Sequence, residues 1–352
     1  MRQVWAILIG ILMLVGGMMP LRAQSGMAMI PKDAWTLYLN RYVDASGRVV
    51  DDANGGISHS EGQGYGMLLA FFADDRASFE RIWSFTRTEL LIRDDGLAAW
   101  RWDPDKTPHI TDVNAASDGD LLIAYALARA GQSWNEPGYL ASARRIARAI
   151  GRVMVVRDGS RTILLPGAVG FAAGERADGP IVNLSYWIFE ALPVMKQFAP
   201  DTRWDALQQS GLDLIRAAQL GPAKLPPDWI SLADGTPALA AGFPPVFGYN
   251  SLRIVLYLLR AGIRDASLLS TFQRNWLTDN DGAPAVVDIK SGRVVTRLTE
   301  PGYRMLGATL ACAMSGTQIP EDLRQFQPTF YYPATLYLLS YQLIAEKYPQ
   351  CL

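Results

Sequence analysis

The sequence predicts an all-α protein in which two layers of helices form a closed ring, or toroid. Apolar residues recur at helical spacing from about residue 33 onward, and strand-like segments are few and short. The helices also alternate in character. Some are rich in Gly, Ala and Tyr and apolar on most faces, whereas the helices between them carry stripes of Arg, Asp and Gln. Because helices that are apolar all round are buried, we expect an inner layer covered by an amphipathic outer layer.

Loops rich in Gly, Pro and Asp separate the predicted helices. In chain order the helices span residues 33–43, 60–74, 76–91, 117–131, 136–155, 183–198, 202–219, 248–262, 265–277, 301–315 and 330–347. The inner helices are those that begin near residues 60, 117, 183, 248 and 301. Short strands are expected at 162–165, 285–288 and 294–297, as hairpins within loops. If the inner helices run parallel, their first turns meet at one end of the ring, where a cleft would collect them.

The first 23 residues have the parts of a secretory signal peptide. Arg2 precedes an apolar run from Val4 to Met19, and Ala23 offers a small residue for cleavage. An uncleaved membrane anchor is the alternative, because the run approaches the ~18 residues that span a bilayer. Both interpretations predict export. We therefore expect a secreted or periplasmic protein in which residues 24–352 form a single domain, without stable membrane insertion once the signal is cleaved.

Composition argues against several classes of function. The chain of 352 residues is 49% hydrophobic and 19% charged, which is typical of a globular protein with a large core. A net charge of -1, with no Lys/Arg run and no phosphate-binding glycine pattern, argues against a nucleic acid or nucleotide partner. With two histidines and no cysteine cluster, we expect no metal site and no cofactor. Cys312 and Cys351 permit at most one disulfide.

The segment Ser60–Met67 (SEGQGYGM) places one carboxylate, that of Glu61, among three glycines at the start of an inner helix. Each glycine costs roughly 1 kcal/mol relative to alanine in a helix interior, so helix propensity does not explain them. We expect the bare backbone to let a neighbouring helix or a bulky ligand approach Glu61. Ser60 and Gln63 have the spacing of a capping box.

The next inner helix begins with the segment 117–120, which contains two aspartates. Ser117 and Asp120 repeat the capping-box spacing, which favours a helix cap as the role of Asp120. Asp118 has two interpretations. It is either an acidic residue that stabilises the first turn or a carboxylate presented to the cleft.

Helix 248–262 begins with Asn250 and Arg253 on one face. Because an arginine among Leu, Ile and Val is costly to bury alone, we expect it to contact Asp118, Glu61 or a ligand hydroxyl, unless it points to solvent. Aromatic residues flank the starts of the inner helices and suit an extended sugar chain, whose apolar ring faces stack on aromatic rings. They are Trp100, Trp102, Tyr186, Trp187, Trp229, Tyr249 and Tyr303, and we assign Trp100, Trp102, Tyr186 and Tyr249, with Arg253, to substrate binding.

These motifs resemble a known family. SEGQGYGM at 60–67 and ASDGDLLIAYALARAGQSW at 116–134 are similar to the two signatures of glycoside hydrolase family 8. The resemblance extends over most of the chain through GRVV at 47–50, LLPGAVGF at 164–171, NLSYW at 183–187 and LPPDW at 225–229. The chain most resembles the secreted endo-1,4-β-glucanases encoded with bacterial cellulose synthases.

The resemblance implies an (α/α)6 barrel of six inner and six outer helices with short β-hairpins in its loops. It also implies hydrolysis of internal β-1,4-glucosidic bonds of cellulose, cello-oligosaccharides or a related β-glucan, with inversion of configuration. A role in cellulose biosynthesis and a contact with the cellulose synthase complex follow from the same family context. Two alternatives stay open, namely a glucan-binding relative with little activity and a chitosanase or lichenase of the same family.

For the site residues, the resemblance implies that Glu61 is the general acid, or proton donor, and that Asp118 is an active-centre carboxylate that touches the sugar. A general acid must carry a proton, yet a helix N-terminus favours the ionised form. A neighbouring Asp118 and a partly desolvated cleft would both favour the protonated form of Glu61.

One position departs from the family pattern. Cellulose-associated members carry the base aspartate in a Tyr-Asp-Ala-x-Arg segment, and this chain has Asn250 at that position, in the segment 249–253. An amide can orient water but cannot act as its carboxylate base. Members with asparagine there supply a glutamate from a long insertion, and no comparable insertion is present in this sequence. We therefore rank Asp118 first as the base, then Asp228 or Glu300, then the absence of an efficient base.

Overall fold

A computed structural model describes residues 29–352, and the predicted signal peptide at 1–23 lies outside this part of the chain. Helices dominate the described residues. In chain order the α-helices are α1 (Lys32–Tyr42), α2 (Ser60–Phe72), α3 (Arg76–Phe85), α4 (Ser117–Ser133), α5 (Pro137–Val153), α6 (Leu192–Phe198), α7 (Trp204–Ala217), α8 (Arg253–Arg260), α9 (Ala266–Phe272), α10 (Pro301–Ser315) and α11 (Tyr331–Lys347). Shorter helical turns are η1 (Thr86–Leu90), η2 (Leu184–Tyr186), η3 (Gln273–Thr278), η4 (Glu321–Leu323) and η5 (Pro349–Cys351).

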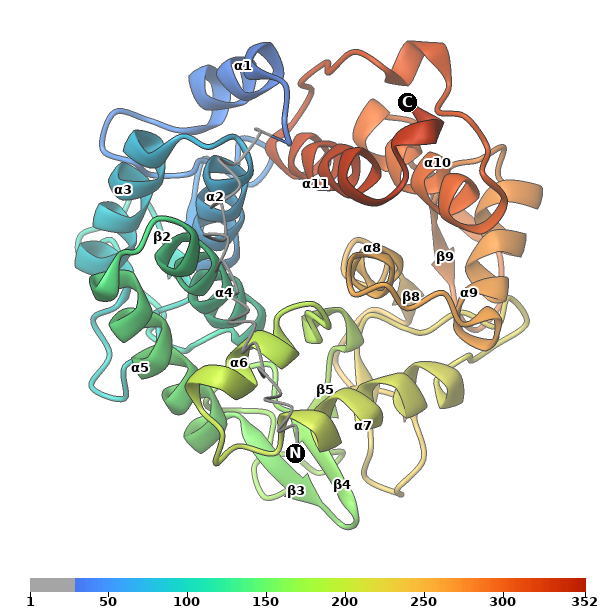
Figure 1. Cartoon of the computed structure of the whole chain (residues 1–352). Coiled ribbons are helices and arrows are strands. Elements are labelled where there is room, and N and C mark those ends of the chain that lie inside the picture. Colours follow the sequence, from blue (N-terminus) through green and yellow to red (C-terminus); the bar gives the residue numbers. More distant parts are fainter. Residues whose placement is uncertain (1–28) are drawn as a thin grey trace, which may run out of the picture.

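The helices form a ring around a central axis (Figure 1). Helix α2 contacts α4, α4 contacts η2 and α6, η2 contacts α8, and α8 is followed by α10, α11 and again α2, which closes the ring. Helices α1, α3, α5, α7 and α9 lie at the periphery in Figure 1. Nearly every residue of α4 is buried, whereas α5 buries one side and exposes a row of arginines. The expected alternation of buried and amphipathic helices is therefore present.

The described part of the chain has four small antiparallel sheets in its loops. Strands β3 (Val155–Asp158) and β4 (Arg161–Leu164) form a hairpin, and β9 (Ala285–Asp288) and β10 (Val294–Arg297) are joined by β8 (Val246–Phe247). Strand β5 (Ile181–Val182) pairs with β6 (Ile230–Ser231), which pairs with β7 (Ala238–Leu239). Strand β1 (Ser58–His59) pairs with β2 (Arg101–Trp102), placing Ser58 opposite Trp102 immediately before α2. The predicted strands are thus present, but two of the sheets have a third strand.

Two of the predicted helices begin later than the sequence pattern indicates. The segment 183–198 contains only the short turn η2, a non-helical stretch and then α6, and Asn183 caps η2 by accepting from Ser185 N. The segment 248–262 becomes helical only at Arg253, because residues 248–252 form a turn. The Gly248 and Ser251 amides in this turn donate to the carboxylate of Asp228, each at 2.9 Å. The turn that contains Asn250 is therefore held by Asp228, which lies outside helix α8.

A disulfide joins Cys312 of α10 to Cys351 of η5, with the two Cα atoms 6.1 Å apart. The two cysteines thus make the one bond that the sequence permits, and it attaches the C-terminal turn to the core. Within residues 29–352, no helix is both long enough and apolar enough to cross a bilayer.

Candidate active site

A cleft of ≈ 600 Å³ opens where α2 and α4 begin. Its walls contain seven of the eight residues that the sequence assigns to the site, namely Glu61, Asp118, Asn250, Trp100, Tyr186, Tyr249 and Arg253. Segments far apart in the chain therefore meet at one end of the ring. Trp102 is the exception and does not line the cleft.

Glu61 lies in the first turn of α2, but the cap of this helix differs from the predicted capping box. The N-cap is His59, whose Nδ1 accepts from Gly62 N at 3.0 Å. Because Nδ1 accepts, the ring proton resides on Nε2, which faces Asp51 Oδ2 at 3.4 Å. Gln63 turns inward instead, accepting from Val49 N at 2.6 Å. The imidazole, not Ser60, thus fixes the turn that carries Glu61.

Two glycines let the starts of α2 and α4 approach closely. A Cβ atom on Gly119 would lie 2.1 Å from Ser60 Oγ and 2.7 Å from Glu61 N. A Cβ on Gly64 would lie 2.5 Å from Leu122 Cβ. Neither space accommodates a methyl group, so the expectation that bare backbone admits a neighbouring helix is confirmed at Gly64. The same contact brings Glu61 and Asp118 to one wall of the cleft.

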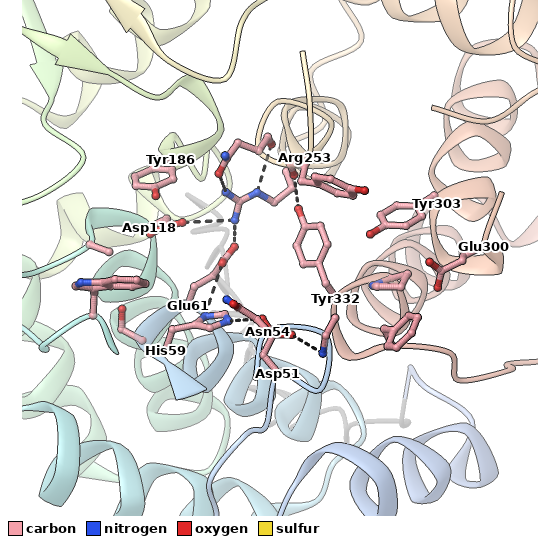
Figure 2. Close-up of a pocket in the computed structure, with 18 residues that line it drawn as sticks. Asp51, Asn54, His59, Glu61, Asp118, Tyr186, Arg253, Glu300, Tyr303 and Tyr332 are labelled. Atoms are coloured by element: carbon pink, nitrogen blue, oxygen red, sulfur yellow. Dashed lines mark hydrogen bonds and ion pairs between the residues drawn. The ribbon is translucent and has the colours of Figure 1, made fainter. Parts of the chain in front are cut away.

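Arg253 lies between the two carboxylates (Figure 2). Its Nη1 contacts Glu61 Oε1 and lies 3.4 Å from Asp118 Oδ2. Its Nη2 donates to Ser185 Oγ and to Asn250 Oδ1, each at 3.0 Å. The side chains of Arg253 and Asp118 are each 3% exposed and that of Glu61 is 18% exposed. The predicted partners of the buried arginine are therefore both present, and one guanidinium charge is shared by two carboxyl groups.

Burial determines the ionisation of the aspartates at the start of α4. It raises the pKa of Asp118 to about 7, against the opposing effect of the Gly119 N–H that the carboxylate accepts. Burial also raises the pKa of Asp120 well above its usual range. The predicted cap role of Asp120 is wrong, because its Oδ1 accepts from Ala98 N at 2.8 Å and the N-cap of α4 is Ala116. Asp120 thus anchors a loop behind the cleft.

Asn250 faces the cleft, and a buried carboxylate lies behind it. Its Nδ2 lies 3.4 Å from Asp228 Oδ2, and Asp228 is 6% exposed. Burial raises the pKa of Asp228, opposed by the hydrogen bonds from Ser251 and Gly248. Glu300 lines the other side of the cleft and accepts from Thr329 Oγ1 at 2.5 Å (Figure 2). The two carboxylates that the sequence offers as alternative bases therefore both adjoin the site, one behind Asn250 and one in the wall.

Of the aromatic residues assigned to substrate binding, some line the cleft and one does not. Trp100 lines the cleft half-buried, with its Nε1 donating to Asp112 Oδ2 at 2.7 Å. Tyr249 is 49% exposed and lines the same space. Trp102 instead stacks on His109 with ring centroids 4.1 Å apart, outside the cleft lining. The geometry therefore does not support substrate contact for Trp102.

Several lining residues were not among the sequence-derived site residues, including Asp51, Asn54, Phe330 and Tyr332. Tyr332 donates from its hydroxyl to Tyr249 O at 2.6 Å and so holds the far side of the turn that carries Asn250. These residues come from a loop before α2 and from the start of α11, where no motif marks them. Among the described residues, no group of three or more His, Cys, Asp or Glu is placed to hold a metal.

Comparison with known proteins assigns the chain to a family. The model of glycosyl hydrolases family 8 matches residues 12–344. A protein of Novacetimonas hansenii named "probable endoglucanase" is 38% identical over 318 residues, which cover 89% of this chain and 90% of the relative. The solved structure of the endo-β-1,4-glucanase of Acetobacter xylinum superposes with a TM-score of 0.79 at 37% identity, covering 89% of this chain and 97% of that one. An endoglucanase of Klebsiella pneumoniae, itself a family 8 glycosyl hydrolase, gives a TM-score of 0.79 at 33% identity over 88% of this chain and 98% of that one. This chain therefore belongs to glycosyl hydrolase family 8.

Proposed function

We propose that the protein is an endo-β-1,4-glucanase that hydrolyses internal bonds of cellulose or a related β-glucan. The observation that carries this proposal is the placement of Glu61 and Asp118 side by side on a buried Arg253 in an open, aromatic-lined cleft. The endoglucanase names of the relatives support the same activity.

Glu61 is the proton donor in this proposal. It protonates the glycosidic oxygen while a water molecule attacks the anomeric carbon from the opposite face, which inverts the configuration. The charge of the buried cluster allows one proton on the Glu61–Asp118 pair, and in this proposal Glu61 donates it. Two carboxyl groups share the single guanidinium of Arg253, so the cluster is neutral when one of them is protonated. Asp118 then acts as the active-centre carboxylate that contacts the sugar.

The lining of the cleft suits a polymer. Trp100, Tyr186 and Tyr249 supply flat ring faces for stacking on sugar rings, and the hydroxyl of Tyr303 and the carboxylate of Glu300 supply polar groups on the other side. Arg253 acts on the two carboxyl groups and borders the bound sugar. An open cleft with such groups on both walls admits a chain at an internal bond, which supports the endo mode of cleavage.

The same proposal includes the architecture and the setting of the protein. The ring of contacts from α2 to α11, together with the structures of its relatives, supports an (α/α)6 barrel of six inner and six outer helices. Residues 24–352 form one domain that follows a cleaved signal peptide, and the enzyme acts outside the cytoplasm, in the periplasm or beyond. There it trims β-glucan during bacterial cellulose biosynthesis, in contact with the cellulose synthase complex.

One observation favours a second candidate, a catalytically weak glucan-binding protein. Asn250 occupies the position where the family pattern places an aspartate base, and its amide oxygen already accepts from Arg253. Under this alternative the cleft binds β-glucan but turns it over slowly. Chitosanase and lichenase activities are tested by the same assays on chitosan and mixed-linkage glucan.

Release of reducing ends from carboxymethylcellulose, together with the fall in its viscosity, tests the proposal. The wild type should cut the polymer with a rapid fall in viscosity, and Glu61→Gln should lose activity by about 100-fold or more while still binding cello-oligosaccharides. A wild type that binds cellopentaose but releases no reducing ends supports the second candidate. Cleavage of chitosan or mixed-linkage glucan in preference to carboxymethylcellulose contradicts the proposed substrate.

A further inference from the structure

Asp228 is attached to the cleft through the side chain of Asn250. Asp228 Oδ1 accepts from the backbone amides of Gly248 and Ser251, and its own amide donates to Val246 O at 2.8 Å. Its Oδ2 lies toward Asn250 Nδ2 at 3.4 Å. Asp228 does not line the cleft itself, whereas Asn250 does. The carboxylate is therefore separated from the cleft by one side chain.

The contacts of Asn250 fix the orientation of its amide. Arg253 Nη2 donates to Oδ1, so Oδ1 is the carbonyl oxygen, and Nδ2 is the group directed at Asp228. A carbonyl oxygen has two lone pairs, and Arg253 uses one of them. The second can accept a hydrogen bond from a water molecule in the cleft. Water, Asn250 and Asp228 can then form a continuous row of donors and acceptors.

We propose that Asp228 is the proton acceptor of the hydrolytic reaction and that Asn250 conducts the proton to it. As the water oxygen bonds to the anomeric carbon, its proton passes to Asn250 Oδ1. At the same time Asn250 Nδ2 gives one of its protons to Asp228 Oδ2. The amide becomes its imidic acid tautomer and Asp228 becomes neutral, so that one proton leaves water and one arrives at the carboxylate. The reverse shift and proton exchange with solvent restore both groups after product release.

The other carboxylates of the site are less suited to accept this proton. Glu61 and Asp118 both contact the guanidinium of Arg253, and protonation of the second of them would leave that cation uncompensated. Asp228 has only neutral N–H partners among the described residues, so protonation breaks no ion pair. Its burial favours the neutral form as well, which makes the carboxylate a better proton acceptor.

This inference rests on the proposed function, because it assigns a proton path to that reaction. Asp228→Asn should lower kcat on cellopentaose by about 100-fold or more and leave KM within about twofold. Asn250→Leu, which has a similar volume and no amide, should lower kcat by a similar factor. The double variant should lose no more than either single variant, because the two groups act as one path. Asp75→Asn is the matched control, since Asp75 also accepts from neutral N–H groups, Ser78 N and Trp35 Nε1, but caps the outer helix α3.

Exchanging the two residues tests whether Asp228→Asn is slow because it lacks a carboxylate base, since the family pattern places that base at position 250. Asp228→Asn combined with Asn250→Asp moves the carboxylate to the cleft and keeps a pair of hydrogen-bonding partners. We expect kcat to recover at least about 10-fold over Asp228→Asn alone. The acidic limb of the kcat–pH profile should shift to lower pH, because a carboxylate at the half-buried position 250 is less buried than Asp228 and accepts from Arg253.

Three results would overturn the inference. They are an Asp228→Asn variant with kcat within about threefold of the wild type, independent and multiplicative losses in the double variant, and an exchanged pair that regains nothing. If Asp228→Asn does not fold, the inference is tested by the kcat of Asn250→Leu. A kcat of Asn250→Leu equal to that of the wild type overturns the inference. A wild type that does not cleave cellopentaose contradicts the proposed function itself. An active wild type with an unaffected Asp228→Asn contradicts only the proton path.

Discussion

Replacing Asp118 with asparagine tests the electrostatics of the buried cluster through protein stability. Asp118 is 2% exposed, and its burial raises its pKa to about 7, compared with about 3.9 in an unfolded chain. The folded protein therefore holds this proton more tightly than the unfolded chain does. The resulting stabilisation is complete below pH ~3.9 and is lost as the pH rises through about 7. At 1.36 kcal/mol per pKa unit, the loss amounts to about 4 kcal/mol.

Urea unfolding of the wild type and Asp118→Asn between about pH 4 and pH 8 measures this contribution. The free energy of unfolding of the variant, relative to the wild type, should rise by about 4 kcal/mol across this range. A cost of the amide that is independent of pH cancels from the comparison. The pH-dependent difference belongs to the Asp118–Glu61 pair, because both carboxyl groups share Arg253. Asp234→Asn, at an exposed position between β6 and β7, is the control and should show no such rise.

A difference in unfolding free energy that is independent of pH would contradict the reasoning. It would mean that Asp118 has the same proton affinity in the folded and unfolded states. A difference that falls with rising pH would mean that Arg253 outweighs burial and keeps Asp118 ionised.

Three other substitutions test the packing and contacts of the site. Gly119→Ala should lower kcat by about 100-fold, because the methyl group displaces the backbone of Glu61. Gly138→Ala in α5 is the control. It has space for its methyl group and should leave kcat unchanged in the same assay. Arg253→Met should lower the free energy of unfolding at pH 7 by about 3 to 5 kcal/mol in urea titrations, since it leaves two buried carboxyl groups without their cation. Trp100→Ala should raise KM for cellopentaose about 10-fold with little change in kcat, and Trp102→Ala should leave KM unchanged and lower the melting temperature.

Much of the fold follows from local sequence signals. The predicted helix at 301–315 matches α10 because Pro301 opens it and Gly316, with φ of 70°, ends it. The hairpin at 285–288 and 294–297 is equally well marked by short runs of β-branched residues on either side of a turn. At these positions, capping and turn chemistry act within a few residues of the helix or strand that they define.

Other features depend on contacts that no local pattern contains. The turn before α8 is held by Asp228, distant in the chain, which accepts hydrogen bonds from two backbone amides of the turn. The helical periodicity of 248–262 therefore overestimates the length of the helix. The Gln63 side chain accepts from Val49 N and so does not form the capping box that its spacing predicts. The cap of α2 is instead His59, which accepts from Gly62 N. Glu61 and Asp118 could be singled out from their motifs, but their shared partner Arg253 could be predicted only as one of several possibilities.

Proton NMR of cellopentaose during the first minutes of hydrolysis tests the central claim most directly, because it observes the anomer that the enzyme releases. The proposed mechanism predicts that the α-anomer of the new reducing end appears first and mutarotates later, with no product from Glu61→Gln over the same period. Initial appearance of the β-anomer, or an undiminished rate in Glu61→Gln, would contradict an inverting endoglucanase that uses Glu61 as its proton donor.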